Sequence, residues 1–309
     1  MNQKRLLAFL HYQRYLGLTD LDFSNGLHGL HGTWISYATQ AIVVVIFVSA
    51  LVAALAESLF YLDTQTKTGM IFDNAVIIAT SISQLLANLW FRAQQQSQVA
   101  LLHRLSHVVS RLQVEPEALP HPRWFYRIWL VVCFLYVIMM AHFATKTWLT
   151  NMELSHVLTL LGFALRCILA NFQITCYSGV VWILRTSLRV QADQLKRMVL
   201  TAATISSEDV ALSLKVHDEI LLLGQRDVVE VYGGVLVFLF MYQVMQCVLI
   251  FYLSSLSIFR TFKELLFILA WLWPMLFYLI LPLAANDVLN QALKGQKVKG
   301  IKDPFGCQK

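Results

Sequence analysis

The sequence predicts an all-α fold: a polytopic membrane helical bundle of about six transmembrane helices, with a cytoplasmic amino terminus and with helices that extend into the cytoplasm. Three observations lead to this prediction. Hydrophobic residues make up 58% of the 309 residues, whereas charged residues make up 14%. Apolar runs of roughly 20 residues, which as helices would cross a hydrocarbon core about 30 Å thick, recur along the chain. Lysine and arginine gather in alternate connections between these runs.

Six stretches meet the length that a membrane-spanning helix requires. They are 41–61, 70–91, 128–148, 157–184, 231–258 and 265–283. Continuous apolar runs lack the in-out alternation of a membrane β-strand, so helix is the expected spanning form. The chain then divides into a cytoplasmic segment 1–34, a transmembrane domain 35–289 and a polar tail 290–309.

The basic residues predict the orientation of the spans. Of the 24 Lys and Arg residues, 3 precede the first run, 5 lie between the second and third, 6 between the fourth and fifth, and 5 after the sixth. The positive-inside rule places these segments, and therefore both termini, in the cytoplasm of a multi-pass protein of the cell membrane. The loops 92–127 and 185–230 are expected to be helical, because their apolar residues recur at helical spacing. These residues are Leu101, Leu105, Val108 and Leu112 in the first loop, and Leu188, Leu195 and Val199 in the second.

The sequence gives little support to catalysis, to a cofactor or to nucleic-acid binding. His103 and His107 are four residues apart on a predicted helix, a spacing that suits a metal ion, but Arg104 stands where a zinc peptidase has its glutamate. We therefore expect solvated histidines and no metal site. Walker loops, Gly-x-Gly-x-x-Gly, nucleophile elbows and paired carboxylates at a shared depth are absent, and the basic residues form no dense stripe.

Polar side chains inside the apolar runs are candidates for a ligand pocket. Arg166 lies about nine residues into the fourth run, where it either reaches the outer interface, forms a structural pair, or handles a ligand or ion. Gln173, Gln243 and Gln246 place amides well inside the fourth and fifth runs. Such amides either form hydrogen bonds between helices or line a wet pocket.

Four further candidates have an ordinary explanation as well. Asp73 and His142 fall near the outer ends of their runs, where interfacial placement is common. Trp271 and Trp273 supply aromatic surface in the sixth run, although a Trp near the end of a span is most often an interface anchor. We retain all four as candidate residues around a small-molecule ligand.

Three segments carry a family resemblance. They are Tyr15-Leu16-Gly17-Leu18, the long fourth run from Asn171-Phe172-Gln173 through Leu184, and the segment Leu221 to Gln243 ahead of and within the fifth run. Together with the cytoplasmic amino terminus and short external loops, they resemble the insect gustatory receptor family of the insect chemoreceptor superfamily. The resemblance implies a chemosensory receptor subunit of a ligand-gated cation channel, tetrameric with its own kind or with relatives, that binds small tastants or contact cues among its second to sixth helices.

The sequence departs from the family at one element. The family's seventh span carries Thr-Tyr followed several residues later by Gln-Phe, and neither dipeptide occurs here. We therefore expect a shortened member that lacks the seventh, pore-lining helix and does not conduct ions alone. The alternative is a membrane transporter or a non-conducting regulatory or scaffold protein, although a transporter more often shows paired halves with broken helices.

Overall fold

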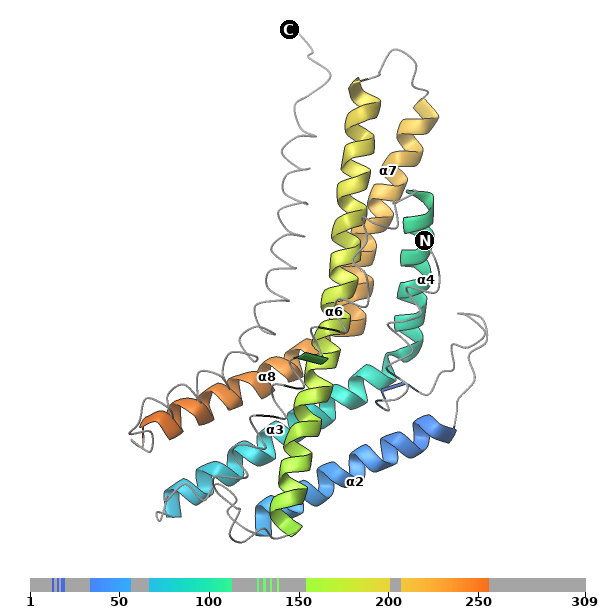
Figure 1. Ribbon diagram of the computed structural model, residues 1–309. Helices are drawn as coiled ribbons and strands as arrows, with labels where there is room; N and C mark the ends of the chain where they lie inside the picture. Colours follow the sequence, from blue (N-terminus) through green and yellow to red (C-terminus); the bar gives the residue numbers. More distant parts are fainter. Residues whose placement is uncertain are drawn as a thin grey trace.

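A computed structural model describes residues 13, 16, 18, 19, 34–56, 67–112, 127, 130, 131, 134, 138, 154–200 and 207–255. Seven helical elements occupy this part of the chain (Figure 1). They are α2 (Trp34–Ala56), α3 (Lys67–Ala93), α4 (Gln95–Arg111), α6 (Leu154–Leu200), α7 (Ser207–Leu222), the π-helical turn η2 (Leu223–Asp227) and α8 (Val228–Ser255). None of the described residues belongs to a β-strand, so the all-α prediction is confirmed for them.

Four of the six predicted spans coincide with described helices. The runs 41–61 and 70–91 overlap α2 and α3, the run 157–184 lies within α6, and 231–258 overlaps α8. Only residues 130, 131, 134 and 138 of the third span are described, and all four are helical. The sixth span and the tail 290–309 lie outside the described residues, so the number of spans and their orientation stay predictions.

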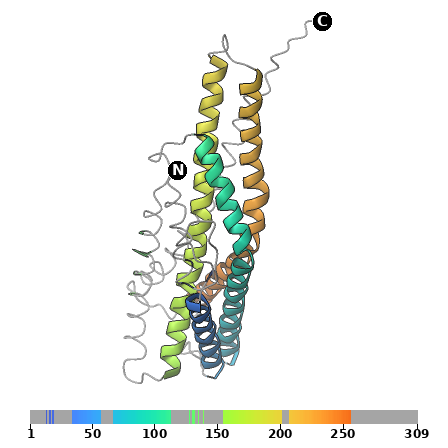
Figure 2. The same cartoon turned by 90° about the vertical axis from the view of Figure 1, so that its right-hand side faces the viewer.

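Helix α6 is the axis of the molecule. Its 47 residues, at about 1.5 Å each, make a rod of roughly 70 Å, more than twice the thickness of a hydrocarbon core. One end of α6 packs against α2 and α3, and the other runs beside α7 (Figures 1 and 2). Within the stretch Ala164–Met198, 88% of the most apolar 18-residue window is buried. Because this central portion of α6 is covered on nearly all sides, its apolar residues form core rather than a lipid-facing stripe.

The helices around one end of α6 turn apolar side chains outward. On α2 the exposed residues include Ile42, Val45 and Val52, and on α8 they include Val237 and Phe240. Exposed apolar surface of this extent is typical of contact with lipid or with another protein. We call α2, α3, α8 and residues 154–184 of α6 the apolar part. Among the described residues, the stretches Ala164–Met198 and Ala211–Met245 are long and apolar enough to cross a membrane, and the apolar stretch Tyr37–Ser49 is shorter.

Helices α4 and α7, the turn η2 and residues 185–200 of α6 form the extension. The face formed by Leu101, Leu105, Val108 and Leu112 is buried, which confirms the spacing-based prediction for this loop. Gln194 Nε2 donates to the carbonyl oxygen of Leu112 at 3.0 Å and so satisfies a backbone group at the end of α4. The helical prediction for 185–230 is confirmed over residues 185–200 and 207–230.

The apolar part meets the extension at two bends. Helix α3 passes into α4 at Gln94, where Gln98 Nε2 donates to the carbonyl oxygen of Phe91 at 2.9 Å. Helix α7 passes into α8 through η2, a turn of the wider π form. Figure 1 shows α3 and α8 running obliquely to α4 and α7. The two bends contact each other through an ion pair, with Arg104 NH1 2.8 Å from Asp227 Oδ2.

Candidate functional site

Arg166 is buried between α6 and α3. Arg166 is 2% exposed, which contradicts the interpretation that its side chain reaches the outer membrane interface. Its NH1 group donates to Ser81 Oγ at 2.7 Å and to Thr80 Oγ1 at 3.1 Å, and its Nε donates to the carbonyl oxygen of Gly162 at 3.3 Å. Buried guanidinium groups require such acceptors, because desolvation of the charge is costly. Arg166 therefore ties the middle of α3 to α6.

Two turns further along α6, three amide side chains form a closed hydrogen-bond ring. Gln84 Nε2 donates to Gln173 Oε1 at 3.2 Å and to Asn88 Oδ1 at 3.0 Å, while Gln173 Nε2 donates to Asn88 Oδ1 at 2.9 Å. Gln84 and Gln173 are completely buried. Gln84 Oε1 and Asn88 Nδ2 have no hydrogen-bond partner among the described residues. The ring thus retains one acceptor and one donor that a further polar group can satisfy.

The arginine site and the amide ring together make one polar stripe between two apolar helices. Its members are Thr80, Ser81, Gln84 and Asn88 of α3, and Arg166 and Gln173 of α6. Sequence reasoning identified the two α6 residues but missed those of α3. A signal was present, because Thr80, Gln84 and Asn88 recur every fourth residue within an apolar run and so share one helix face.

The structure does not bring the remaining candidates to this stripe. Gln243 of α8 is partly buried and forms no hydrogen bond with a described residue. Asp73 and Gln246 lie in α3 and α8, but the structure does not describe their side chains. The other three candidates, His142, Trp271 and Trp273, lie outside the described residues.

The two histidines of α4 are both exposed. His103 and His107 lie on the outer face of the helix, and no group of three His, Cys, Asp or Glu side chains able to hold a metal ion occurs among the described residues. The prediction that they bind no metal stays a prediction.

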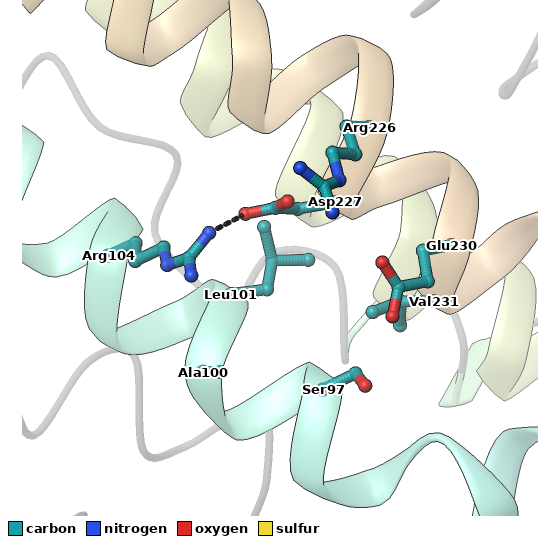
Figure 3. A pocket seen from close by; sticks show the side chains of 8 residues that line it. All are labelled: Ser97, Ala100, Leu101, Arg104, Arg226, Asp227, Glu230 and Val231. Atoms are coloured by element: carbon teal, nitrogen blue, oxygen red, sulfur yellow. Dashed lines mark hydrogen bonds and ion pairs between the residues drawn. The ribbon is translucent and has the colours of Figure 1, made fainter.

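A cavity of about 300 Å³ opens where the two bends meet. Figure 3 shows the side chains around it, which come from α4, η2 and α8. They are Ser97, Ala100, Leu101, Arg104, Arg226, Asp227, Glu230 and Val231. We call this cavity the junction pocket. Sequence reasoning did not predict it, because it exists only where two bends lie side by side.

Comparisons with known proteins give a consistent picture. The family model described as 7tm chemosensory receptor matches residues 6–298. Gustatory and pheromone receptor 39a, isoform B, of Drosophila melanogaster is 60% identical over 297 residues, which cover 96% of this chain and 79% of that protein. Isoform C of the same receptor is 24% identical over 250 residues, which cover 75% of this chain and 63% of the isoform.

Proposed function

The chain belongs to the 7tm chemosensory receptor family, and from that premise we propose that its polar stripe is the element that responds to a bound small molecule. The protein is a gustatory-type chemosensory receptor, of a family whose insect gustatory members are ligand-gated cation channels. We further propose that it acts as one subunit of a homo- or hetero-oligomer. The observation that carries the ligand proposal is the buried arginine bound to two hydroxyls beside an amide ring with open hydrogen-bond capacity.

The chemistry of the stripe suits a ligand with hydroxyl or carbonyl oxygens. The oxygens of Thr80 and Ser81 accept hydrogen bonds from Arg166, and the Ser81 hydroxyl keeps a hydrogen of its own to donate. Gln84 Oε1 and Asn88 Nδ2 offer one acceptor and one donor nearer the extension. Polar groups placed in an otherwise apolar surrounding are what fix the orientation of a small ligand in a pocket.

The same contacts connect a ligand to movement of helices. Four side-chain hydrogen bonds of the stripe join α3 to α6. The other hydrogen bonds described above lie within α3 or connect Arg166 to its own helix. A ligand that took over the Thr80 or Ser81 hydroxyl would weaken this connection in the bound state. Differential contact of this kind is what a ligand needs in order to shift a conformational equilibrium.

Calcium imaging tests this proposal in cells that co-express the chain with a full-length relative. Sucrose, caffeine and a long-chain alkene are applied as probes of three chemical types. We expect a response to at least one probe, and an increase of about ten-fold in the half-maximal concentration for Thr80→Val or Ser81→Ala, since a hydrogen bond to a charged or bound group contributes on the order of 1.4 kcal/mol.

Thr186→Val is the matched control for the imaging experiment. Among the described residues, the Thr186 hydroxyl bonds the carbonyl oxygen of Trp182 in its own helix and no other group, so its removal leaves the stripe intact. Surface amounts of all variants are compared by biotinylation. A stripe variant that reaches the surface and responds with the wild-type half-maximal concentration would assign these hydroxyls to packing alone.

We propose that the extension faces the cytoplasm. The distribution of basic residues supports this orientation, and an arginine and a tyrosine meet at the boundary, where Arg92 lies 5.2 Å from the Tyr37 ring centre. An epitope inserted between Leu200 and Ser207 should be reached by antibody only after permeabilisation. Labelling of intact cells would reverse the orientation.

A further inference from the structure

The outward face of α8 changes from apolar to charged at the junction pocket. Residues 226, 230, 234, 237, 241, 244 and 248 follow spacings of four and three and so share one face, which Trp90 of α3 covers at Gly234. Val237, Met241, Val244 and Val248 on this face are exposed. The face ends in the charged Glu230 and Arg226, both of which line the pocket. The end of a hydrocarbon chain lying on α8 would therefore come close to the opposite charges of Glu230 and Arg226.

Aromatic residues place this change at the boundary between hydrocarbon and water. Trp90 of α3 covers Gly234, with the position of a Gly234 Cβ only 2.6 Å from its Cδ2. Arg92 lies over the Tyr37 ring, and Arg185 lies over the Trp182 ring with its guanidinium carbon 5.2 Å from the centre. Trp and Tyr gather at membrane interfaces, because their rings are apolar and their polar atoms need partners. These aromatic residues support placing the pocket at the level of lipid headgroups.

The charges of the pocket balance, and two of them have no partner in the part of the chain that the structure describes. Arg104 and Asp227 form an ion pair across the cavity mouth. Arg226 and Glu230 are exposed and form neither a hydrogen bond nor an ion pair with any described residue. Figure 3 shows the Glu230 carboxylate turned toward the space between α4 and α8. The pocket thus offers one cation on η2 and one anion on the first turn of α8.

We propose that the junction pocket binds the headgroup of a zwitterionic phospholipid with a primary ammonium group. The phosphate pairs with the Arg226 guanidinium, whose planar fork of N–H donors matches phosphate oxygens. The ammonium donates to the Glu230 carboxylate and to Ser97 Oγ, and the acyl chains follow the apolar face of α8. The balanced charge of the four ionised side chains favours a neutral headgroup over an anionic one. Choline lacks N–H donors, so it satisfies the carboxylate less well.

This inference rests on the membrane placement that the family gives to α8, and it does not depend on the ligand-sensing role of the polar stripe. Native mass spectrometry of the purified full chain tests it, with phosphatidylethanolamine, phosphatidylcholine and phosphatidylglycerol as separate probes. We expect the most adducts with phosphatidylethanolamine. Glu230→Gln should lower that binding about ten-fold, because the ammonium contact is lost, and should raise phosphatidylglycerol binding, because the pocket gains a net positive charge. Arg226→Gln should lower the binding of both phospholipids.

Two controls remove the same charges elsewhere. Glu208→Gln on α7 and Arg189→Gln on α6 change exposed residues outside the pocket and should leave lipid binding unchanged.

Ser97→Leu is a further test, because it fills the pocket from α4 and leaves the charges of Arg226 and Glu230 in place. It should also lower phosphatidylethanolamine binding. Thermal midpoints within a few degrees of the wild type, on the order of 1 kcal/mol, verify that each variant is folded.

Three results would overturn the proposal. Equal binding of phosphatidylethanolamine and phosphatidylglycerol by the wild type would show that the balanced charge of the pocket does not favour a neutral headgroup over an anionic one. Unchanged phosphatidylethanolamine binding in Glu230→Gln would show that the Glu230 carboxylate does not contact the ammonium group. Displacement of the lipid by free glycerophosphoethanolamine at equal concentration would assign the pocket to a soluble ligand, because acyl chains would then contribute nothing.

Discussion

Along α6, residues 154–184 pack in the apolar part through buried hydroxyl and amide partners, whereas residues 185–200 pack in the extension beside ion pairs that water reaches. Arg166 bonds two hydroxyls at 2% exposure. In the extension, the Arg104 side chain is 61% exposed where it pairs with Asp227. A similar pair joins Arg111 and Glu219 at 3.5 Å.

The difference follows from the solvent around each part. Water solvates an exposed ion pair and reduces its worth, so such pairs can be numerous and individually weak. In a hydrocarbon surrounding each polar group must be satisfied internally, so a few hydrogen bonds carry a larger share of the packing energy. Helix α6 is therefore joined to α3 by a few buried hydrogen bonds, whereas α4 is joined to η2 and α7 by exposed and individually weak ion pairs.

The largest effect is expected at Arg166. The double change Thr80→Val with Ser81→Ala removes two acceptors from a buried charge and should destabilise the protein by about 3 kcal/mol. Thermal unfolding in detergent micelles, followed by tryptophan fluorescence, measures the loss. Adding Arg166→Met should recover most of it, because the charge that needed the hydroxyls is gone. If the triple variant were no more stable than the double, the arginine would not be the reason for the loss.

A smaller loss is expected where α8 packs closely on α3. Gly234→Ala places a methyl group against the Trp90 ring and should cost about 1–3 kcal/mol through overpacking. Gly233→Ala is the matched control, because its added carbon would lie at an ordinary 3.5 Å from the Val229 side chain. The same melting experiment should show relief of the Gly234→Ala loss in a Trp90→Leu background. Equal losses at the two glycines would exclude this close contact as the cause.

The amide ring should show a coupling of about 1 kcal/mol between Gln84 and Gln173. A double-mutant cycle with Gln84→Leu and Gln173→Leu measures it as the departure from additive losses. Gln243→Leu should change stability by less than about 0.5 kcal/mol, because this amide bonds no described residue. Additive losses for the pair would show that the ring is not one cooperative unit.

The smallest effect is expected for the exposed pair of Arg104 and Asp227. A cycle with Arg104→Ala and Asp227→Ala should give a coupling of about 0.2–1 kcal/mol. Raising sodium chloride from about 0.05 M to about 0.5 M should remove most of it, because salt screens exposed charges. The coupling between Gln84 and Gln173 should not respond to salt. A salt-resistant ion pair would mean that the extension is held by interactions as protected from water as those of the apolar part.

The sequence was sufficient for what depends on the pattern of a single helix. Apolar run length located α2, α3, α6 and α8, and helical spacing identified the buried face of α4. The family resemblance is confirmed by the match over residues 6–298.

What the sequence could not supply depends on how helices face each other. Nothing in the run around Arg166 indicates that Thr80 and Ser81, more than 80 residues earlier, provide its acceptors. The junction pocket needs the bend at Gln94 and the turn η2 to lie side by side. Neither contains a proline, and Gly224 of η2 alone does not indicate a π turn. The residue pattern of one helix does not indicate which residues of another helix will face it.

A change in the winding of η2 would rotate α8 relative to α7. A π turn holds more residues than an α turn, so rewinding Leu223–Asp227 into α-helix would swivel α8 by about a quarter of a turn about its own axis relative to α7. Helix α8 carries Gly234 against Trp90 and carries Glu230 at its near end, next to Arg226 of η2. Such a rotation would bring Gly234 and Glu230 against new neighbours at the same time, without breaking the helix.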